Sequence, residues 1–568
     1  MKTKLTYTYP AFLQSCFLIA SCILFINLQT SGQSKNEEVT IIAPYIPSIG
    51  DATKIPFRPD ITQDKQDPPA FEYEYITKRF ETSMELNSVN AMKYSKDKKD
   101  EAYRNYAKVG LGNYQTPYLD FMASSLQSEK YLFGARIRHL SSQGKIKDYP
   151  PSAYSHNQIS VFGKTFSKTH TLSANIGYKR DVVHFYGFMP DSFPEATYTK
   201  DDIKQRFQHF YGEAEYGSNY QDKDKLNHTF GLGLHYYSDY FDTRELQLSF
   251  LTKLNKEFGT IGRDYEHALS LELGLEYLSY HDSLTTSNPL YFLIRPVYLF
   301  EFGQYKFEAG IGINMVFENT PANSSYTMDV FPLLKAEVVI VEDKIKAYAE
   351  VSGNRTINSF RSMTAMNPFI TSTPQLINTD EQIKIGGGIT GNAGGLNFLA
   401  EASYAYINDM PFFVTDTLLA LQNKFDVIYD NINLLKVKAS LGYVKLDQLS
   451  ARLFAAYYHY IPKEEEKAWQ MPNYEVGLDA GYTFLEKYTV RTSVLALGSK
   501  YAKSYEGSQV VADKISGALD LGFGFDYRIN RMISAYADVN NLLNQNYQRW
   551  YQYPVQGILV MVGVKLSF

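Results

Sequence analysis

The chain has 568 residues, including 47 tyrosines and 36 phenylalanines, and its formal net charge is -5. That charge, without a basic patch interleaved with aromatic residues, argues against a nucleic-acid partner. The mean hydropathy of -0.30 resembles that of a soluble protein, but a barrel of alternating strands has a similarly low average and concentrates tyrosine at both membrane–water interfaces. The aromatic content of 15% therefore favours a membrane barrel over a large soluble all-β protein, which is the alternative.

The first residues predict a secretory signal peptide over residues 1–32. Two early lysines precede a long apolar run, and small residues follow it at positions 30–32, which is the order of a cleavable signal. Both cysteines, Cys16 and Cys22, lie inside this segment, so we expect neither disulfides nor cysteine-ligated metals in the mature protein. Residues 19–22 loosely resemble a lipoprotein cleavage site, but the apolar run continues beyond them.

Residues 33–103 predict an N-terminal extension, either a reduced plug or a periplasmic segment. The stretch is charged, and prolines from Pro44 to Pro69 interrupt any long element. Residues 93–101 form a charged run typical of a solvated linker. Beyond the signal peptide no apolar stretch reaches the roughly 20 residues of a membrane-spanning helix, so a mature chain that spans a membrane has to cross it as a barrel.

From residue 104 onward, apolar and polar residues alternate with the period of two that strands produce. The alternation is clear in residues 172–179, 345–352, 474–484 and 519–528. In each of these segments charged residues fall on one face only, as a lipid-facing exterior requires. The other face is expected to line the inside of the barrel.

The links between these strands alternate in length. Short turns are predicted at 166–169, 341–344, 485–487 and 529–531, and long polar links at 181–205, 354–381, 408–432, 461–472, 498–514 and 541–556. Tight periplasmic turns that alternate with long external loops are typical of outer-membrane barrels. Counting back from the last residue gives about 22 strands, the first near residues 104–112, and an even count places both ends in the periplasm. The predicted fold is therefore all-β: an outer-membrane-type transmembrane antiparallel β-barrel of about 22 strands over residues 104–568, preceded by a short periplasmic or lumenal segment.

The last strand has a candidate signal for barrel insertion. Val562, Val564, Leu566 and Phe568 share an apolar face, and the chain ends on an aromatic residue. This strand resembles the terminal strand of bacterial outer-membrane barrels, which the insertion machinery reads. The resemblance implies localisation in the cell outer membrane, with outer-membrane lipid and the insertion machinery as partners. Lys565 lies on the opposite face, where we expect neutralisation to have little effect.

About 22 strands over residues 104–568, together with a local motif, resemble the barrel of TonB-dependent outer-membrane receptors. In that family an Asn-Leu-Phe-Asn-x-x-Tyr motif precedes a loop and the terminal strand. The corresponding residues here are Asn541, Leu542, Leu543, Asn544 and Tyr547, and Leu543 stands where phenylalanine is usual. The resemblance implies an unknown ligand at the external loops and transport across the outer membrane, with TonB supplying energy.

The N-terminal part departs from that family. A full receptor has a globular plug inside its barrel, whereas only residues 33–103 separate the predicted signal peptide from the first strand here. The resemblance therefore implies a reduced or missing plug. A short apolar segment within this part resembles the strand by which receptors pair with TonB, although a plain β-segment is the alternative. It consists of Val39, Thr40, Ile41, Ile42 and Ala43.

No group of residues predicts catalysis, a cofactor or a metal site. The ten histidines are scattered, and residues 386–388, three glycines, lie within an alternating strand rather than in a phosphate-binding loop. No Ser/His/Asp set can be placed at one rim of the barrel. We therefore expect no enzyme activity, no cofactor and no bound metal.

Charged residues on the inner face are expected to pair with one another, because a lone charge in a dry lumen is costly. These residues are Lys346, Glu350, Arg452, Glu475, Asp479, Arg491, Asp526 and Arg528. Three consecutive glutamates at 464–466 are interpreted as a solvated acidic tip of an external loop, with cation capture or a partner contact as alternatives.

The sequence thus predicts ligand binding and transport across the outer membrane. The alternatives are a plugless structural or accessory barrel subunit of an outer-membrane complex, or a passive channel. Residues 33–103 separate these hypotheses. Binding of TonB by residues 39–43 would favour uptake, and docking to another envelope protein would favour assembly.

Overall fold

The computed structural model describes residues 103–568, with short gaps at 126–127, 129, 196, 259–264, 320–323, 446–447 and 507–508. The predicted signal peptide, nearly all of the predicted N-terminal extension and the segment 39–43 lie outside these described residues.

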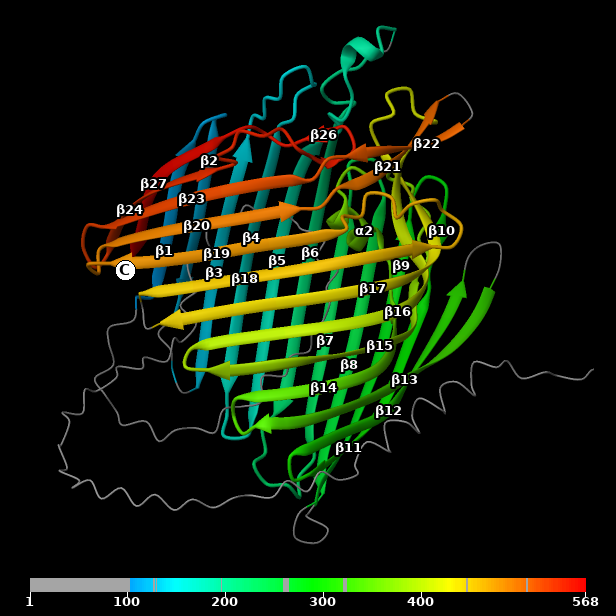
Figure 1. The fold of residues 1–568 in the computed structure, drawn as a ribbon, viewed down its shortest axis with the longest axis vertical. Helices are drawn as coiled ribbons and strands as arrows, with labels where there is room; N and C mark the ends of the chain where they lie inside the picture. The colour runs from blue at the N-terminus through cyan, green and yellow to red at the C-terminus, as the bar shows by residue number, and fades with distance from the viewer. Residues whose placement is uncertain are drawn as a thin grey trace, which may run out of the picture. The chain divides into compact units, whose positions relative to one another are not determined.

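The described residues form a closed antiparallel ring, the barrel, in which successive strands pair and the first strand pairs with the last (Figure 1). The first half of the ring consists of β1 (Asn105–Gly112), β2 (Thr116–Ser124), β3 (Tyr131–Ser142), β4 (Tyr154–Phe166), β5 (His170–His184), β6 (Lys204–Ser218), β7 (Asn227–Ser238), β8 (Arg244–Phe258), β9 (Tyr265–His281), β11 (Leu290–Phe302) and β12 (Tyr305–Asn319). The second half consists of β13 (Ser324–Val341), β14 (Ile345–Thr356), β15 (Thr379–Ala393), β16 (Leu396–Thr415), β17 (Phe425–Lys445), β18 (Leu449–Pro462), β19 (Tyr474–Phe484), β20 (Tyr488–Leu497), β23 (Ala518–Arg528), β24 (Ile533–Asn540) and β27 (Leu559–Ser567). The predicted class and the count of 22 strands are confirmed.

The remaining elements belong to the links. They are the 3-10 helix η1 (Pro190–Ser192), β10 (Thr286–Ser287), α2 (Phe360–Met366), the hairpin β21 (Lys500–Glu506) with β22 (Gln509–Ile515), and the pair β25 (Gln548–Trp550) with β26 (Tyr553–Pro554). None of the helices in the described part of the chain is long and apolar enough to cross a membrane.

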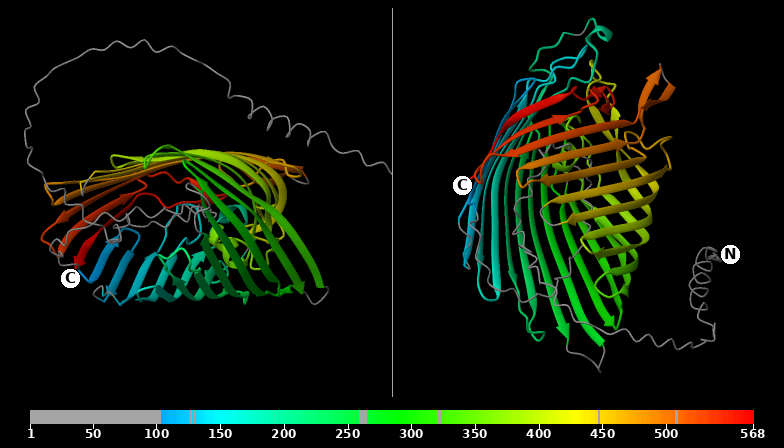
Figure 2. Two further views of the ribbon diagram at one scale, coloured as in Figure 1. Left: turned by 90° about the horizontal axis from the view of Figure 1, so that it is seen from below. Right: turned by 60° about the vertical axis from the view of Figure 1, so that its left-hand side comes forward.

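The links gather at two ends of the barrel. The turn end carries short links, including the four predicted turns, which the structure places between β4 and β5, β13 and β14, β19 and β20, and β23 and β24. The loop end carries the long links, among them 185–203, 357–378, 463–473, 498–517 and 541–558. The hairpin of β21 and β22 projects from this end (Figures 1 and 2).

One predicted link is wrong in extent. The segment 408–432 was expected to be a long loop, but β16 continues to Thr415 and β17 starts at Phe425. These two strands have 20 and 21 residues, whereas β1 and β24 have 8 each. Eight strand residues span roughly 26 Å, about the height of the apolar band of such barrels. The long strands therefore extend beyond the band at the loop end, where their apolar side chains are buried.

The two faces of the wall follow the predicted alternation. In β27, Val560, Val562 and Val564 are exposed on the outside, and Met561 and Lys565 are buried on the inside. Closure of the ring gives each strand a partner on both edges, so the wall satisfies its backbone hydrogen bonds without water. An apolar exterior with paired backbone is what a lipid environment demands.

The seam between β1 and β27 is closely packed around two glycines. Gly110 and Gly563 lie opposite each other in the strand register. The Tyr536 ring lies against both, and a Cβ on Gly563 would overlap the Val109 carbonyl oxygen. The Lys108 ammonium lies 4.1 Å from the centroid of the Tyr536 ring. Small residues are thus required here because a large ring occupies the inner side of the seam.

Five inner-face side chains, which we call the seam charge chain, link the strands next to this seam: Lys565, Asp526, Arg491, Asp538 and Lys108. Lys565 Nζ lies 2.8 Å from Asp526, Arg491 donates to Asp526 at 3.0 Å and to Asp538 at 2.7 Å, and Lys108 Nζ lies 3.1 Å from Asp538. Lys565 is only 3% exposed. The expectation that neutralising Lys565 has little effect is therefore wrong in its premise, because this lysine is buried in an ion-pair network.

Candidate functional site at the loop end

The link 357–378 folds back into the loop end of the barrel and packs against the inner wall. It contains α2, which begins after Ser359; the Ser359 side chain accepts from the Ser362 amide, and the Ser362 side chain accepts from the Ser359 amide. Phe360 and Met363 are fully buried. Residues 354–381 were predicted to be a long polar link. The prediction of a polar link is wrong, because the apolar residues of this segment point into the barrel and not into solvent.

The wall anchors α2 through a buried carboxylate. Glu245, at the start of β8, is buried and accepts from the Phe360 amide at 2.6 Å and the Arg361 amide at 3.4 Å. On β7, the Tyr237 hydroxyl is 2.7 Å from the Thr364 hydroxyl. An acidic group at the first turn of a helix satisfies amides that have no partner within the helix. These contacts fix the link to the back wall of the barrel.

Twelve buried residues, the mouth cluster, surround α2. They are Val183, Phe207, Tyr237, Tyr280, Phe360, Met363, Ile370, Phe413, Phe425, Val427, Trp550 and Tyr553. The cluster joins β5, β6, β7 and β9 to β16 and β17 on the facing wall, with two links between them. A large apolar core therefore lies inside the loop end.

The link 541–558 packs against link 357–378 at the loop end. Phe369 and Tyr553 stack with ring centroids 3.8 Å apart, and Phe413 meets the Trp550 ring edge-on at 5.2 Å. The Tyr553 hydroxyl donates to the Asn423 carbonyl. Aromatic pairs of this kind each add about 0.5–1.5 kcal/mol beyond area burial, so the two links stabilise each other.

The receptor-like C-terminal motif braces this same link. The Asn541 side-chain amide donates to the Gln545 carbonyl at 2.7 Å and the Gln556 carbonyl at 2.8 Å, and Asn544 Oδ1 accepts from the Ile558 amide at 2.8 Å. Both asparagines have positive φ, 48° and 52°, a conformation that asparagine tolerates better than most residues. The two asparagines thus hold the return of the chain into β27.

The remaining motif residues divide between the two faces. The Tyr547 hydroxyl donates to Asp520 on β23 at 2.8 Å. Leu542 and Leu543 are exposed. Because the described residues do not enclose the side chain at position 543, a leucine can stand where the family motif usually has phenylalanine.

Charged groups near the mouth cluster are partly buried. Asp239 accepts from Gln205 at 3.0 Å and from the Ser372 hydroxyl, which ties link 357–378 to β6. Burial raises the pKa of Asp239. Lys424 lies over the Phe185 ring at 4.6 Å, and burial lowers the pKa of its ammonium. Both groups are thus in an environment that disfavours their charged forms.

The C-terminal residues predicted to carry the insertion signal lie on the seam. Val562, Val564 and Phe568 are exposed on the outside, and Leu566 is half-buried. The Phe568 carbonyl accepts from the Asn105 amide at 2.8 Å, so the final residue completes the closure with β1. Their role in insertion stays a prediction.

Several inner-face charges pair as expected. Glu350 pairs with Lys384 at 2.7 Å, and Lys346 pairs with Glu337 at 3.0 Å. At the loop end, the glutamates 464–466 were predicted to form a solvated acidic tip, but hydrogen bonds and an ion pair hold two of them.

Glu465 pairs with Lys503 at 2.8 Å and accepts from the Trp469 indole at 2.6 Å. The amides of Glu464 and Glu465 donate to Asp430, at 3.1 and 2.9 Å. Within the described ranges, no three His, Cys, Asp or Glu side chains come together as a metal-binding group.

Sequence reasoning missed α2, its anchor Glu245 and the two tryptophans of the links. Link 357–378 has a recognisable helix signal in the sequence. Ser359 and Ser362 form a capping pair, and the apolar residues Phe360, Met363 and Met366 follow at intervals of three. The partner of that helix is 115 residues away in sequence. No local pattern could identify it.

No protein-family model matches the sequence, and a sequence comparison with curated proteins gives no match. Comparison with solved structures does give matches. The ferric-catecholate import receptor Fiu of E. coli K12 is 10% identical, with a TM-score of 0.62 over 83% of this chain and 82% of that chain. The pyoverdine outer-membrane receptor FpvA of Pseudomonas aeruginosa PAO1, solved with bound pyoverdine, is 11% identical, with a TM-score of 0.63 over 83% of this chain and 79% of its own.

The FrpB iron transporter of Neisseria meningitidis is 9% identical, with a TM-score of 0.62 over 83% of this chain and 82% of that one. At this level of identity the likeness concerns the fold. The described part of the chain has the fold of outer-membrane receptor barrels, as the sequence resemblance to the TonB-dependent family predicts.

Proposed function

We propose that this barrel transports a ligand across the outer membrane, with its loop end facing outward and links 357–378 and 541–558 acting as the closure. The observation that carries the proposal is the mouth cluster, in which two links from opposite walls pack inside a closed ring. Proteins with the same fold include an import receptor, a receptor bound to pyoverdine and an iron transporter.

Without a bound ligand, we expect the two links to remain packed inside the loop end. Moving α2 out of the barrel would return Phe360 and Met363 to water, at a cost of about 3–6 kcal/mol for the two side chains. That cost allows an open population of roughly 1% or less. A ligand that opens the barrel therefore has to bind the open arrangement more tightly than the closed one.

Ion conductance in planar bilayers tests this closure. We expect the full mature chain to conduct potassium chloride poorly, and Glu245→Ala to conduct more because the amides of Phe360 and Arg361 lose their anchor. Glu257→Ala, an exposed position on the same strand, is the matched control and should behave as wild type. Open-pore conductance of the wild-type protein would contradict the closure.

Energy coupling is a separate part of the proposal. Residues 39–43 are proposed to add a strand to TonB, because an extended apolar segment suits that mode of recognition. Ile41→Pro removes a backbone donor and should abolish capture of the full chain by the purified C-terminal domain of TonB. Ile41→Val keeps the donor and should bind normally. Equal capture of both variants would assign TonB contact, if any, to another segment.

A structural or accessory role is the second candidate. Leu418 and Leu284, at the tips of two loop-end links, are 93% and 80% exposed. An envelope partner that docked at this end would cover these side chains. Affinity purification from gently solubilised outer membranes distinguishes the candidates: a stoichiometric envelope partner with no TonB favours the accessory role.

A further inference from the structure

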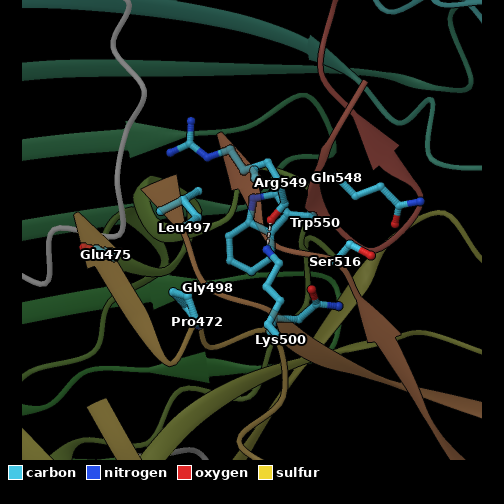
Figure 3. Close-up of a pocket in the computed structure, with 11 residues that line it drawn as sticks. Pro472, Glu475, Leu497, Gly498, Lys500, Ser516, Gln548, Arg549 and Trp550 are labelled. Carbon is cyan, nitrogen blue, oxygen red and sulfur yellow. Dashed lines mark hydrogen bonds between the residues drawn. The ribbon is translucent and has the colours of Figure 1, made fainter. Parts of the chain in front are cut away.

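A small cavity lies beside the mouth cluster, where three links meet (Figure 3). Its volume is about 50 Å³, and its lining includes Gln470, Glu475, Leu497, Lys500, Arg549 and Trp550. A cavity of this size holds roughly four water-sized groups. It is too small for a siderophore-sized ligand, which occupies pockets of about 300 Å³ or more.

Gln470 is the most constrained residue of this cavity. It is 1% exposed and has a φ of 62°, a left-handed conformation that is costly for a residue other than glycine or asparagine. Its backbone amide donates to the Tyr501 carbonyl at 2.7 Å, and its side-chain oxygen accepts from the Tyr551 amide at 3.3 Å. Within the described part of the chain its side-chain nitrogen has no acceptor, although it is buried. A buried donor without a partner costs about 1–3 kcal/mol, so this amide calls for an acceptor.

Lys500 brings a positive charge to the same cavity. Its ammonium donates to the main-chain carbonyl of Arg549 (Figure 3). The same ammonium lies 5.3 Å from the centroid of the Trp550 ring. An ammonium has three donors. Among the described residues, the Arg549 carbonyl is the one acceptor of the Lys500 ammonium. Arg549 lies within electrostatic range of Lys500.

Glu475 is the acidic group of the lining, and it also lies within electrostatic range of Lys436 and Arg549. The cavity thus has buried donors from two links, Gln470 and Lys500, and an apolar floor of Leu497 and Trp550. Buried donors that lack acceptors favour an anion that accepts hydrogen bonds.

We propose that this cavity binds a small oxyanion, a carboxylate or a phosphate group, held by the side-chain amide of Gln470 and the ammonium of Lys500. The bound group would join links 463–473, 498–517 and 541–558. Because Trp550 belongs to the mouth cluster, occupancy would also stabilise the closed loop end. The site does not depend on whether the barrel transports a ligand.

Intrinsic fluorescence gives a direct readout, because the chain has two tryptophans and one of them lines the cavity. Trp550 lines it, and Trp469 precedes Gln470. The full chain in detergent is titrated with acetate and, separately, with phosphate, against chloride at the same ionic strength. A saturable change with acetate assigns a carboxylate site and one with phosphate alone assigns a tetrahedral anion; both support the proposal. A response to chloride equal to both, or no response at all, overturns it.

Variants locate the binding. Lys500→Met is expected to weaken binding at least about tenfold, since a charge-assisted hydrogen bond is lost. Lys514→Met, exposed on the same hairpin, should bind as wild type. Gln470→Gly removes the amide and should weaken binding, while relief of the positive φ offsets part of the stability lost with the Tyr551 hydrogen bond. Binding that survives both Lys500→Met and Gln470→Gly would overturn the assignment, even if one variant alone folds poorly.

Discussion

Single side chains set the charge balance of the inner wall. The seam charge chain has three cations and two carboxylates in an environment with little water, and each carboxylate is shared by two cations. Removal of one member of such a network leaves a buried charge without its partner, which costs far more than the loss of an exposed pair. The closure of the ring is therefore sensitive to individual residues on β20, β23, β24, β1 and β27.

Asp526→Asn is expected to destabilise the folded barrel by about 3–5 kcal/mol, because Lys565 and Arg491 lose their shared carboxylate. Lys565→Gln should cost less, since Asp526 keeps Arg491. Urea unfolding followed by tryptophan fluorescence in detergent measures both. Glu266→Gln breaks the exposed pair with Lys223 and should cost about 1 kcal/mol or less. Equal losses for Asp526→Asn and Glu266→Gln would show that the seam charge chain is not coupled to folding.

Lys500 is expected to titrate near neutral pH. Burial and the nearby Arg549 lower its pKa from 10.5 to about 7, while Glu475 faces the same cavity. The unfolded chain then binds more protons than the folded one between about pH 7 and 10.5, so the stability of this region rises as pH increases through that window and the cost of charge burial is complete below it.

Acylation of Lys500, followed by mass spectrometry from pH 6 to 9, measures this titration. We expect the rate to reach its half-maximum near pH 7, with the exposed Lys514 as the reference residue. A rate at Lys500 that rises in parallel with that at Lys514 would contradict the lowered pKa.

At the scale of elements, the lengths of the strands explain where the closure lies. The short strands β1, β2, β24 and β27 form the seam and cover little more than the apolar band. The long strands β16 and β17 continue beyond it and provide Phe413, Phe425 and Val427 to the mouth cluster. These residues face Val183, Phe207, Tyr237 and Tyr280 of the opposite wall, so α2 is buried between apolar side chains from both walls.

Gly563→Ala is expected to open the seam, because the added methyl group would overlap the Val109 carbonyl oxygen and the Tyr536 ring. Overpacking of this kind costs about 1–3 kcal/mol. Gly163→Ala, on β4, is the control, since its nearest neighbour would be 3.8 Å away. The shift in mobility on heating in SDS gels reports the closed barrel. Unchanged behaviour of Gly563→Ala would mean that β1 and β27 can separate without loss of closure.

At the scale of the whole molecule, the outer and inner surfaces of the barrel differ in polarity. The wall presents apolar residues such as Leu111, Ile176 and Val562 to the outside along its length. The inside is polar along much of the wall but apolar at the loop end. Lipid contact and closure thus use different faces of the same strands, and substitutions on the two faces should separate assembly from transport.

Val562→Asp is expected to lower the amount of assembled barrel in the outer-membrane fraction, because a charge on the lipid face costs about 2 kcal/mol or more near the middle of the membrane. Val562→Leu keeps the apolar surface and should assemble normally. Quantitative immunoblots of membrane fractions, with and without heating, measure the outcome. Recovery of the wild-type protein in the soluble periplasmic fraction would contradict membrane insertion altogether.

The sequence by itself determined the class of fold, the number of strands and the face that each residue of β23 and β27 presents. These properties follow from a period of two and from turns that are local in the chain. The resemblance at Asn541, Asn544 and Tyr547 also pointed to the correct link, whose return into β27 those residues brace.

Only the tertiary structure decided which links enter the barrel and which side chains meet there. Phe360 is apolar in any context, but its burial depends on Glu245, 115 residues away, and on strands from both walls. Gln470, Lys500 and Arg549 belong to three separate links and line one cavity. Contacts of this kind depend on the three-dimensional path of long links, which a repeating strand pattern does not encode.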